Sequence, residues 1–139
     1  MVDIICLGEI LIDMFSTGVG EPLEKAPSFL PVPGGAPANV AIGLAKLGVD
    51  SALISKVGDD PFGKLLRSVL LQNRVDISQL RVDRESRTTL AFISTREDRE
   101  RDFCFYRNPG ADMMLSAQEI SEGFIKTARV FHYGSISMI

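Results

Sequence analysis

Hydrophobic positions along the chain alternate between short unbroken runs and longer runs with helical spacing. Residues 3–7 form an apolar run that Gly8 closes, which is typical of a strand buried on both faces of a parallel sheet. Residues 60–73 repeat apolar side chains at three- and four-residue intervals, which indicates a helix with one buried face. By the same criteria we predict strands at residues 3–7, 51–57, 88–95, 101–107 and 130–136, and helices at residues 36–47, at residues 60–73 and from Ser116 onward, where Glu119 stands at the capping-box position.

The repeated order of strand, helix and strand predicts an α/β fold, an αβα sandwich of the Rossmann type with a mostly parallel sheet. Segments 12–33 and 88–107 interrupt this order, and we expect them to form a small antiparallel flap that stands off the main sheet. Ligands of open parallel sheets bind beyond the carboxyl ends of the strands. We therefore expect Asp13, at the exit of the first strand, to meet Gly34 and Gly35 at the start of the first helix.

Composition narrows the class of protein. Of 139 residues, 45% are hydrophobic and 24% are charged, which is a globular balance. The net charge of -3 gives no reason to expect a nucleic acid or an anionic membrane as a partner. No stretch is long enough to span a bilayer and the first residues lack the pattern of a signal peptide, so we expect a cytoplasmic protein. Cys6 and Cys104 lie in apolar runs without metal-binding spacing, and we expect both to be buried, reduced thiols.

One stretch copies the spacing of a nucleotide-binding phosphate loop. In GDDPFGKL, residues 58–65, Leu65 stands where the loop needs a hydroxyl that binds magnesium, and two aspartates precede the lysine. The alternative is the start of a helix, with an acidic cap and Pro61 in the first turn, and we favour it. The one histidine, His132, lies in a predicted strand, where we expect it to pack in the core rather than act as an acid or base.

A glycine pair, Gly34-Gly35, directly precedes the first predicted helix, and an isolated pair indicates only a tight turn. Here the spacing continues to Asn39, Ala41, Gly48 and Gly58. This register closely resembles the amino-terminal signature of the PfkB family of carbohydrate kinases, which includes ribokinase and fructokinase. Further blocks resemble fructokinases in particular: GEILIDM (8–14), KVGDDPFG (56–63), RTTLAF (87–92), FYRNPGAD (105–112) and FHYGSIS (131–137).

The resemblance implies a sugar-binding site. Carried over by position, Asp13, Gly34, Gly35 and Asn39 would form its floor, with the carboxylate and the amide binding sugar hydroxyls. Phe105 and Arg107 match a region in which an aromatic residue and an arginine approach the sugar, although a surface salt bridge is an equal alternative for Arg107. Gly134 and Ser135 are expected to border the site. Segments 12–33 and 88–107 would be the family's lid, which closes over the sugar, excludes water and offers strand edges for a homodimer.

The resemblance covers only the amino-terminal half of the ribokinase-like fold. In the family, a GAGD-type motif in the carboxyl-terminal half supplies the catalytic aspartate, and no GxGD occurs here. The ATP pocket, the Mg²⁺-positioning motif and the loop for a monovalent cation such as K⁺ belong to that half too. We therefore expect residues 1–139 to be the amino-terminal part of a single kinase domain, without a catalytic residue or metal ligand of its own, and inactive in isolation.

The implied function is ATP-dependent phosphorylation of a sugar hydroxyl, with fructose as the favoured acceptor, by a full-length enzyme. Two alternatives stay open. The chain could serve as a non-catalytic sugar-binding or regulatory module that lacks the nucleotide site. A generic dinucleotide-binding fold is the weaker alternative, because CLGEIL stands where GxGxxG would follow the first strand.

Overall fold

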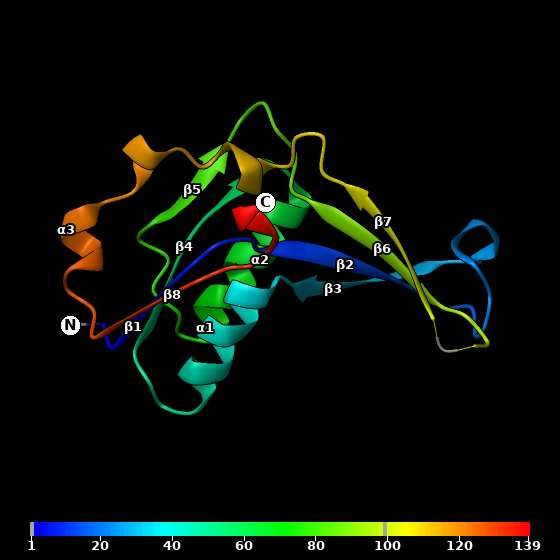
Figure 1. The fold of residues 1–139 in the computed structure, drawn as a ribbon, viewed down its shortest axis with the longest axis horizontal. Coiled ribbons are helices and arrows are strands. Elements are labelled where there is room, and N and C mark those ends of the chain that lie inside the picture. Colours follow the sequence, from blue (N-terminus) through cyan, green and yellow to red (C-terminus); the bar gives the residue numbers. More distant parts are fainter. Residues whose placement is uncertain (1, 99) are drawn as a thin grey trace.

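A parallel sheet forms the body of the molecule (Figure 1). The computed structural model describes residues 2–98 and 100–139. The strands have the order β5-β4-β1-β8, and every neighbouring pair is parallel. Their bounds are β1 (Ile4–Leu7), β4 (Ser51–Gly58), β5 (Leu80–Asp83) and β8 (Val130–Tyr133). The parallel sheet that the sequence predicts is therefore confirmed, with β5 as a strand that the hydrophobic pattern did not indicate.

Helices cover both faces of this sheet, which gives the three layers of an αβα sandwich. On one face, α1 (Ala36–Lys46) and α2 (Pro61–Gln72) pack their apolar stripes against Cys6, Leu53 and Val57. On the other face, Ile5, Ala52 and Ile54 contact the segment that carries α3 (Glu122–Ile125). Short 3₁₀ helices are η1 (Leu23–Lys25), η2 (Ala111–Met114), η3 (Ala117–Glu119) and η4 (Ile136–Met138). No helix in the described ranges is long and apolar enough to cross a membrane.

A second sheet projects from the body, as Figure 1 shows on its right-hand side. Its strands are β2 (Leu11–Ser16), β3 (Phe29–Gly34), β6 (Leu90–Thr95) and β7 (Arg101–Tyr106), in the order β3-β2-β6-β7. Segments 12–33 and 88–107 thus form one flap. The expectation that the flap is antiparallel is wrong for its central pair, β2 and β6, which is parallel. The two strands run in the same direction. β2 follows β1 after only three residues.

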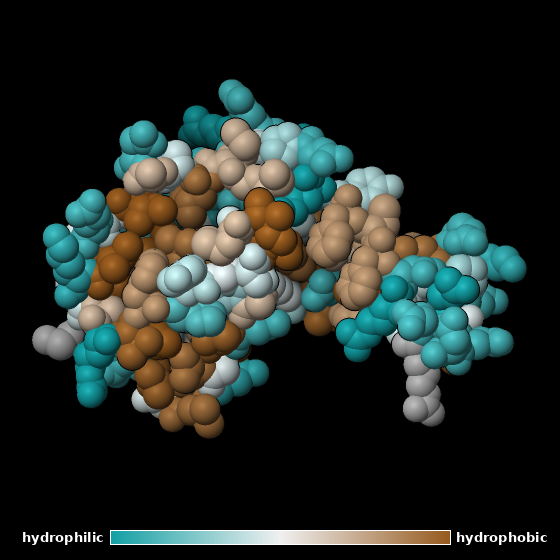
Figure 2. Space-filling model, in the orientation of Figure 1, coloured by the Kyte–Doolittle hydropathy of each residue, from teal (hydrophilic) through white to brown (hydrophobic). Residues whose placement is uncertain are grey.

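The polypeptide after β7 is less helical than the sequence predicts. Ser116 and Glu119 do form a capping box, but the helix that it starts is the single turn of η3. The predicted strand 130–136 ends at Tyr133, and its last residues turn into η4. At the edge of the sheet, β8 leaves Val130, Phe131 and Tyr133 exposed. Figure 2 shows brown, apolar side chains on this side of the body, with paler and hydrophilic residues between them.

The two cysteines differ in their surroundings. Cys6 is fully buried in β1, and burial raises the pKa of its thiol to about 11, which keeps it protonated and unreactive. Cys104 is exposed, so the expectation of a buried thiol is wrong there. The reason is that β7 is an edge strand of the projecting sheet, and most of its residues are exposed. His132 lies opposite Cys6 in β8 and is half-buried, so it is less enclosed than a core histidine.

Candidate functional site

Asp13 and Gly34 meet on two neighbouring strands of the second sheet. Asp13 is the third residue of β2, so it does not stand at the exit of the first strand as the sequence suggests, because the chain passes from β1 into a new strand. A Cβ atom added to Gly34 would lie 2.1 Å from the Oδ2 atom of Asp13. Glycine is therefore required at position 34 because the carboxylate occupies the space of a side chain.

The carboxylate of Asp13 has no hydrogen-bond donor among residues 2–98 and 100–139. It is half-buried, and burial raises its pKa because the charged form loses hydration. Nearly all buried polar groups in proteins have a partner. A partly enclosed carboxylate without one is suited to accept hydrogen bonds from the hydroxyl groups of a small molecule.

Gly35 and Asn39 belong to the start of α1, which follows Gly34 directly. Gly35 has a φ of 104°, and a Cβ atom there would lie 2.5 Å from the carbonyl oxygen of Glu9. The second glycine therefore lets the start of the helix approach the chain between β1 and β2. Asn39 lies in the first turn of α1, where its side chain is exposed and bonds to no described residue. Its amide can both donate and accept a hydrogen bond.

Phe105 lies on the same face of the second sheet as Asp13. The strand register pairs Asp13 with Ala91, and Ala91 with Phe105, so the three residues form one row across β2, β6 and β7. Directly paired residues point to the same face, and two strand spacings separate the ends of the row by about 10 Å. Ala91 is small and buried, so the surface of the sheet is depressed between Asp13 and Phe105. Phe105 is 46% exposed and can cover an apolar part of a ligand.

Arg107 forms an ion pair with Asp112 directly after β7. Its Nε and Nη2 atoms lie 2.9 Å and 2.7 Å from Oδ2 of Asp112. Arg107 thus does form a salt bridge, which the sequence offered as the alternative to a sugar contact. The side chains are 14% and 1% exposed, so the pair is largely enclosed and does not lie on the surface. Arg107 also lines a cavity of about 290 Å³ together with Phe105, Asn108, Ile136 and Ile139. Phe105 therefore belongs both to the row that contains Asp13 and to the cavity that Arg107 lines.

Glu9 anchors the chain that follows β8, a role that the sequence analysis missed. Its carboxylate accepts hydrogen bonds from Ser135, at 2.9 Å from N and 2.7 Å from Oγ, and from Ser137, at 3.3 Å from N and 2.9 Å from Oγ. Burial raises the pKa of Glu9, but these bonds and its own backbone amide outweigh that effect and bring the pKa to about 2. The signal in the sequence was an acidic residue after a buried strand, together with the spaced serines of SIS.

The stretch that resembles a phosphate loop is closed. The carboxylate of Asp60 accepts hydrogen bonds from the backbone amides of Gly63 and Thr88 and from the Thr88 hydroxyl, at 2.8 to 2.9 Å. It also fills the space beside Gly58, where an added Cβ atom would lie 2.4 Å from Oδ2. The interpretation as a capped start of α2 is therefore confirmed. Within the part of the chain that is described, no group of three or more His, Cys, Asp or Glu residues could hold a metal ion.

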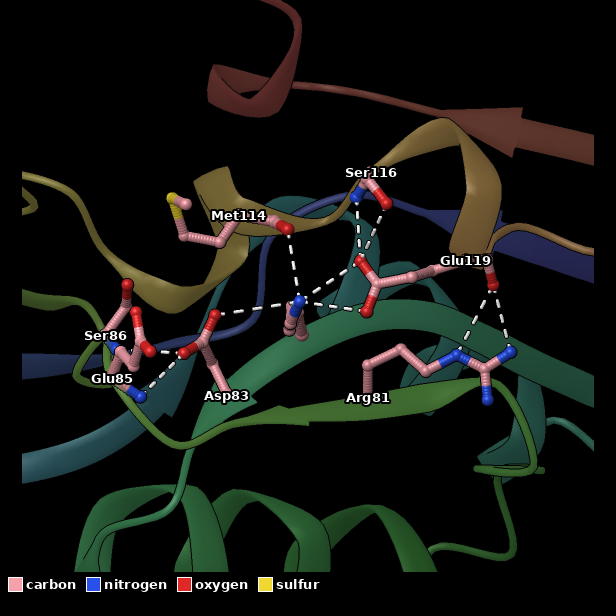
Figure 3. Close-up of polar contacts among 8 residues, drawn as sticks. Arg81, Asp83, Glu85, Ser86, Met114, Ser116 and Glu119 are labelled. Carbon is pink, nitrogen blue, oxygen red and sulfur yellow. Dashed lines mark hydrogen bonds and ion pairs between the residues drawn. The ribbon is translucent and has the colours of Figure 1, made fainter.

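A second ion cluster fixes the segment that carries Asp112. The Nζ atom of Lys56, on β4, lies 2.9 Å from Oε1 of Glu119, 3.1 Å from the carbonyl oxygen of Met114 and 3.6 Å from Oδ2 of Asp83. Figure 3 shows Asp83, Met114 and Glu119 arranged around this ammonium group. The cluster ties both ends of residues 114–119 to the sheet, which holds η2 and Asp112 over the carboxyl ends of the strands.

Comparison with known proteins relates this architecture to sugar kinases. The sequence profile described as pfkB family carbohydrate kinase matches residues 1–139. Probable fructokinase-7 of Arabidopsis thaliana is 52% identical over 136 residues, which are 98% of this chain and 40% of that protein. The crystal structure of fructokinase from Xylella fastidiosa superposes with a TM-score of 0.87 at 34% identity, over 98% of this chain and 42% of that one.

A further structure carries nucleotide. It is described as a putative Ribokinase II from E. coli in complex with ATP and Mg²⁺, and it superposes with a TM-score of 0.87 at 32% identity, over 96% of this chain and 42% of that one. The chain therefore spans about two fifths of the length of these relatives.

Proposed function

Because the chain belongs to the pfkB family of carbohydrate kinases, we propose that it is the sugar-binding part of an enzyme that transfers the γ-phosphoryl group of ATP to a sugar hydroxyl. Fructose is the proposed acceptor, since the relative from Arabidopsis thaliana is named a probable fructokinase. The unpartnered carboxylate of Asp13, held over Gly34, is the observation that carries this proposal.

In the proposed complex, polar side chains bind the sugar hydroxyls and an apolar side chain contacts the C–H face of the sugar. Asp13 accepts hydrogen bonds from two sugar hydroxyls, and Asn39 donates to or accepts from another. Phe105 covers the C–H face of the sugar, and Arg107 donates from the far side of the row. The second sheet acts as the lid, which excludes water so that the phosphoryl group passes to the sugar and not to water.

ATP and Mg²⁺ would supply the phosphoryl group, but the described part of this chain shows no site built for them. Its one phosphate-loop-like stretch is filled by Asp60, and its described residues contain no metal-binding cluster. Because the chain spans about two fifths of the length of its relatives, we assign nucleotide, Mg²⁺, a monovalent cation such as K⁺ and the catalytic base to the rest of the full-length enzyme. The role of this chain is to bind and orient the acceptor hydroxyl.

A homodimer formed through the second sheet is part of the proposal. Leu30, Phe15, Ile93 and Phe103 form a row next to the one that contains Asp13, and all but Ile93 are exposed. Figure 2 shows apolar side chains on the part of this sheet nearest the body, whereas its far end is hydrophilic. Sedimentation equilibrium of the full-length protein tests this: F103E is expected to dissociate the dimer, and a monomeric unmodified protein contradicts it. The cytoplasm stays the proposed location.

The alternative is a non-catalytic sugar-binding module. The observation in its favour is that the groups proposed for the acceptor lie within this chain, while its described residues contain no cluster that could hold the metal ion of a nucleotide complex. Titration calorimetry of the chain with fructose fits both functions. The distinguishing experiment is an assay of ADP formation by the full-length protein with ATP, Mg²⁺ and a panel of sugars. We expect fructose to accelerate ADP formation strongly, and no acceleration by any sugar would overturn the kinase proposal.

A further inference from the structure

The ion pair of Arg107 and Asp112 lies at the junction of the two sheets, next to the proposed sugar site. In Figure 1 the end of β7, η2 and the C-terminal η4 come together there. Arg107 binds Asp112 through Nε and Nη2, and its Nη2 atom also lies 3.4 Å from the carbonyl oxygen of Ile136. Its Nη1 atom bonds to no described residue. The guanidinium is therefore held on one side and keeps two N–H donors available on the side of the cavity.

Both carboxylate oxygens of Asp112 accept hydrogen bonds in this arrangement. One carboxylate oxygen accepts both bonds from Arg107, and the other accepts a hydrogen bond from the hydroxyl of Thr89. The Asp112 side chain is only 1% exposed, so it has no contact with bulk water through which its charge could be screened. A carboxylate this close to a guanidinium cancels most of its field at short range.

The charges around the site therefore favour a neutral ligand. Arg107 is neutralised by Asp112, while the carboxylates of Asp13 and Glu9 face no cation among the described residues. Hydroxyl groups can use the free N–H donors of Arg107 and the acceptors of Asp13 without bringing a charge into the site. A sugar acid would bring a second carboxylate near Asp13 and would find no unpaired cation to receive it.

We infer that Asp112 is a positioning residue that selects neutral sugars over sugar acids, because it fixes Arg107 and cancels its charge. The inference rests on the proposed function, since it concerns the same acceptor site. It names Asp112 as the position at which a change of substrate class is possible.

Two ligands that differ only at one carbon test the inference. Fructose and 2-keto-D-gluconate have the same chain, except that a carboxylate replaces the C1 hydroxymethyl group in the acid. Calorimetry with the unmodified full-length protein is expected to show at least about tenfold tighter binding of fructose, given the electrostatic cost of an unpaired charge. Equal affinity for the two ligands overturns the inference, whether or not any variant folds.

The variant Asp112→Asn then isolates the mechanism. It keeps the shape and an acceptor oxygen for Arg107 but removes the neutralising charge, so the ratio of the two affinities is expected to shift toward the acid about fivefold or more. Asp112→Glu keeps the charge and is expected to keep the preference for fructose. Asp102→Asn, on the same hairpin but away from the junction, is the matched control and is expected to leave the ratio unchanged.

The outcomes separate the two proposals. Binding of fructose with an unchanged ratio in folded Asp112→Asn overturns the inference alone. Binding of neither ligand, with no sugar-stimulated ADP formation, overturns the proposed function and the inference with it.

Discussion

The Oδ2 atom of Asp13 occupies the space in which Gly34 would carry a side chain, 2.1 Å from the position of an added Cβ atom. The substitution Gly34→Ala therefore forces the carboxylate out of its place. We expect it to weaken fructose binding at least tenfold and to lower the free energy of unfolding by about 1–3 kcal/mol, the usual range for overpacking. Calorimetry and urea unfolding measure the two effects.

Gly43→Ala is the matched control for this change. Gly43 lies within α1, and an added Cβ atom there meets nothing within 4 Å. A helix-interior glycine costs roughly 0.5–1 kcal/mol relative to alanine, so this variant is expected to be more stable than the unmodified protein and to bind fructose equally well. Unchanged fructose binding by Gly34→Ala would contradict the role assigned to the contact.

Asp13→Asn separates binding from stability. Burial raises the pKa of Asp13 in the folded state, so folding disfavours the charged form. The free energy of unfolding therefore decreases as the pH rises from the pKa of Asp13 in the unfolded chain to its higher pKa in the folded protein. The decrease persists at neutral pH. The asparagine variant is therefore expected to melt at a higher temperature at pH 7, by about 2 °C or more, while fructose binding is lost. Asp59→Asn, at an exposed position before α2, should change neither property.

Glu9 has the opposite pH dependence. Its pKa falls from 4.5 in the unfolded chain to about 2 in the folded protein, because Ser135 and Ser137 stabilise the carboxylate. The stabilisation is fully present above pH 4.5 and is lost as the pH falls toward 2, by roughly 3 kcal/mol in total. Urea unfolding at a series of pH values is expected to show this loss. The loss should be much smaller in Glu9→Gln, and identical acid dependence in the two proteins would refute the assignment.

We expect Lys56 to stabilise the segment after β7, which it contacts at Met114 and Glu119. The substitution Lys56→Met removes the cation from between Asp83 and Glu119 and leaves two neighbouring carboxylates without compensation. We expect a loss of about 2 kcal/mol in the free energy of unfolding, as for partly buried ion pairs that lose one partner. Hydrogen exchange should show faster exchange of amides in residues 111–120. The exposed pair Lys126 and Glu122 provides the control, because Lys126→Met should cost less than about 0.5 kcal/mol.

The hydrophobic pattern was sufficient for elements whose surroundings are uniform. The strand at 51–57 is buried on both faces and shows as a largely apolar run, whereas α2 has one apolar stripe and shows a helical period. The pattern failed at β2, which leaves the main sheet after β1 and joins another one within three residues. A change of sheet is a tertiary event, and no local period reports it. The helix predicted from Ser116 failed because the capping box starts only one turn before Ser121 begins another.

The sequence predicted which positions belong to the candidate site, but it did not predict the contacts that these residues make. The spacing of Gly34, Gly35 and Asn39 indicated a close approach to the start of α1, but it did not reveal that Gly34 accommodates a carboxylate and Gly35 a neighbouring backbone. The partner of Arg107 was beyond prediction for a similar reason. Asp112 is five residues away across a turn, and only the folded loop brings the two charges together.

The uncovered edge of β8 has a consequence for handling the 139-residue chain alone. Among the described residues, its outer side has no neighbouring strand, and Val130, Phe131 and Tyr133 stand exposed beside it. Unpaired backbone N–H and C=O groups next to bulky apolar side chains can form hydrogen bonds with a strand of another molecule, which leads to aggregation. Light scattering at rising concentration should therefore report growing particles, and a soluble preparation will need a charged substitution such as F131K on that border.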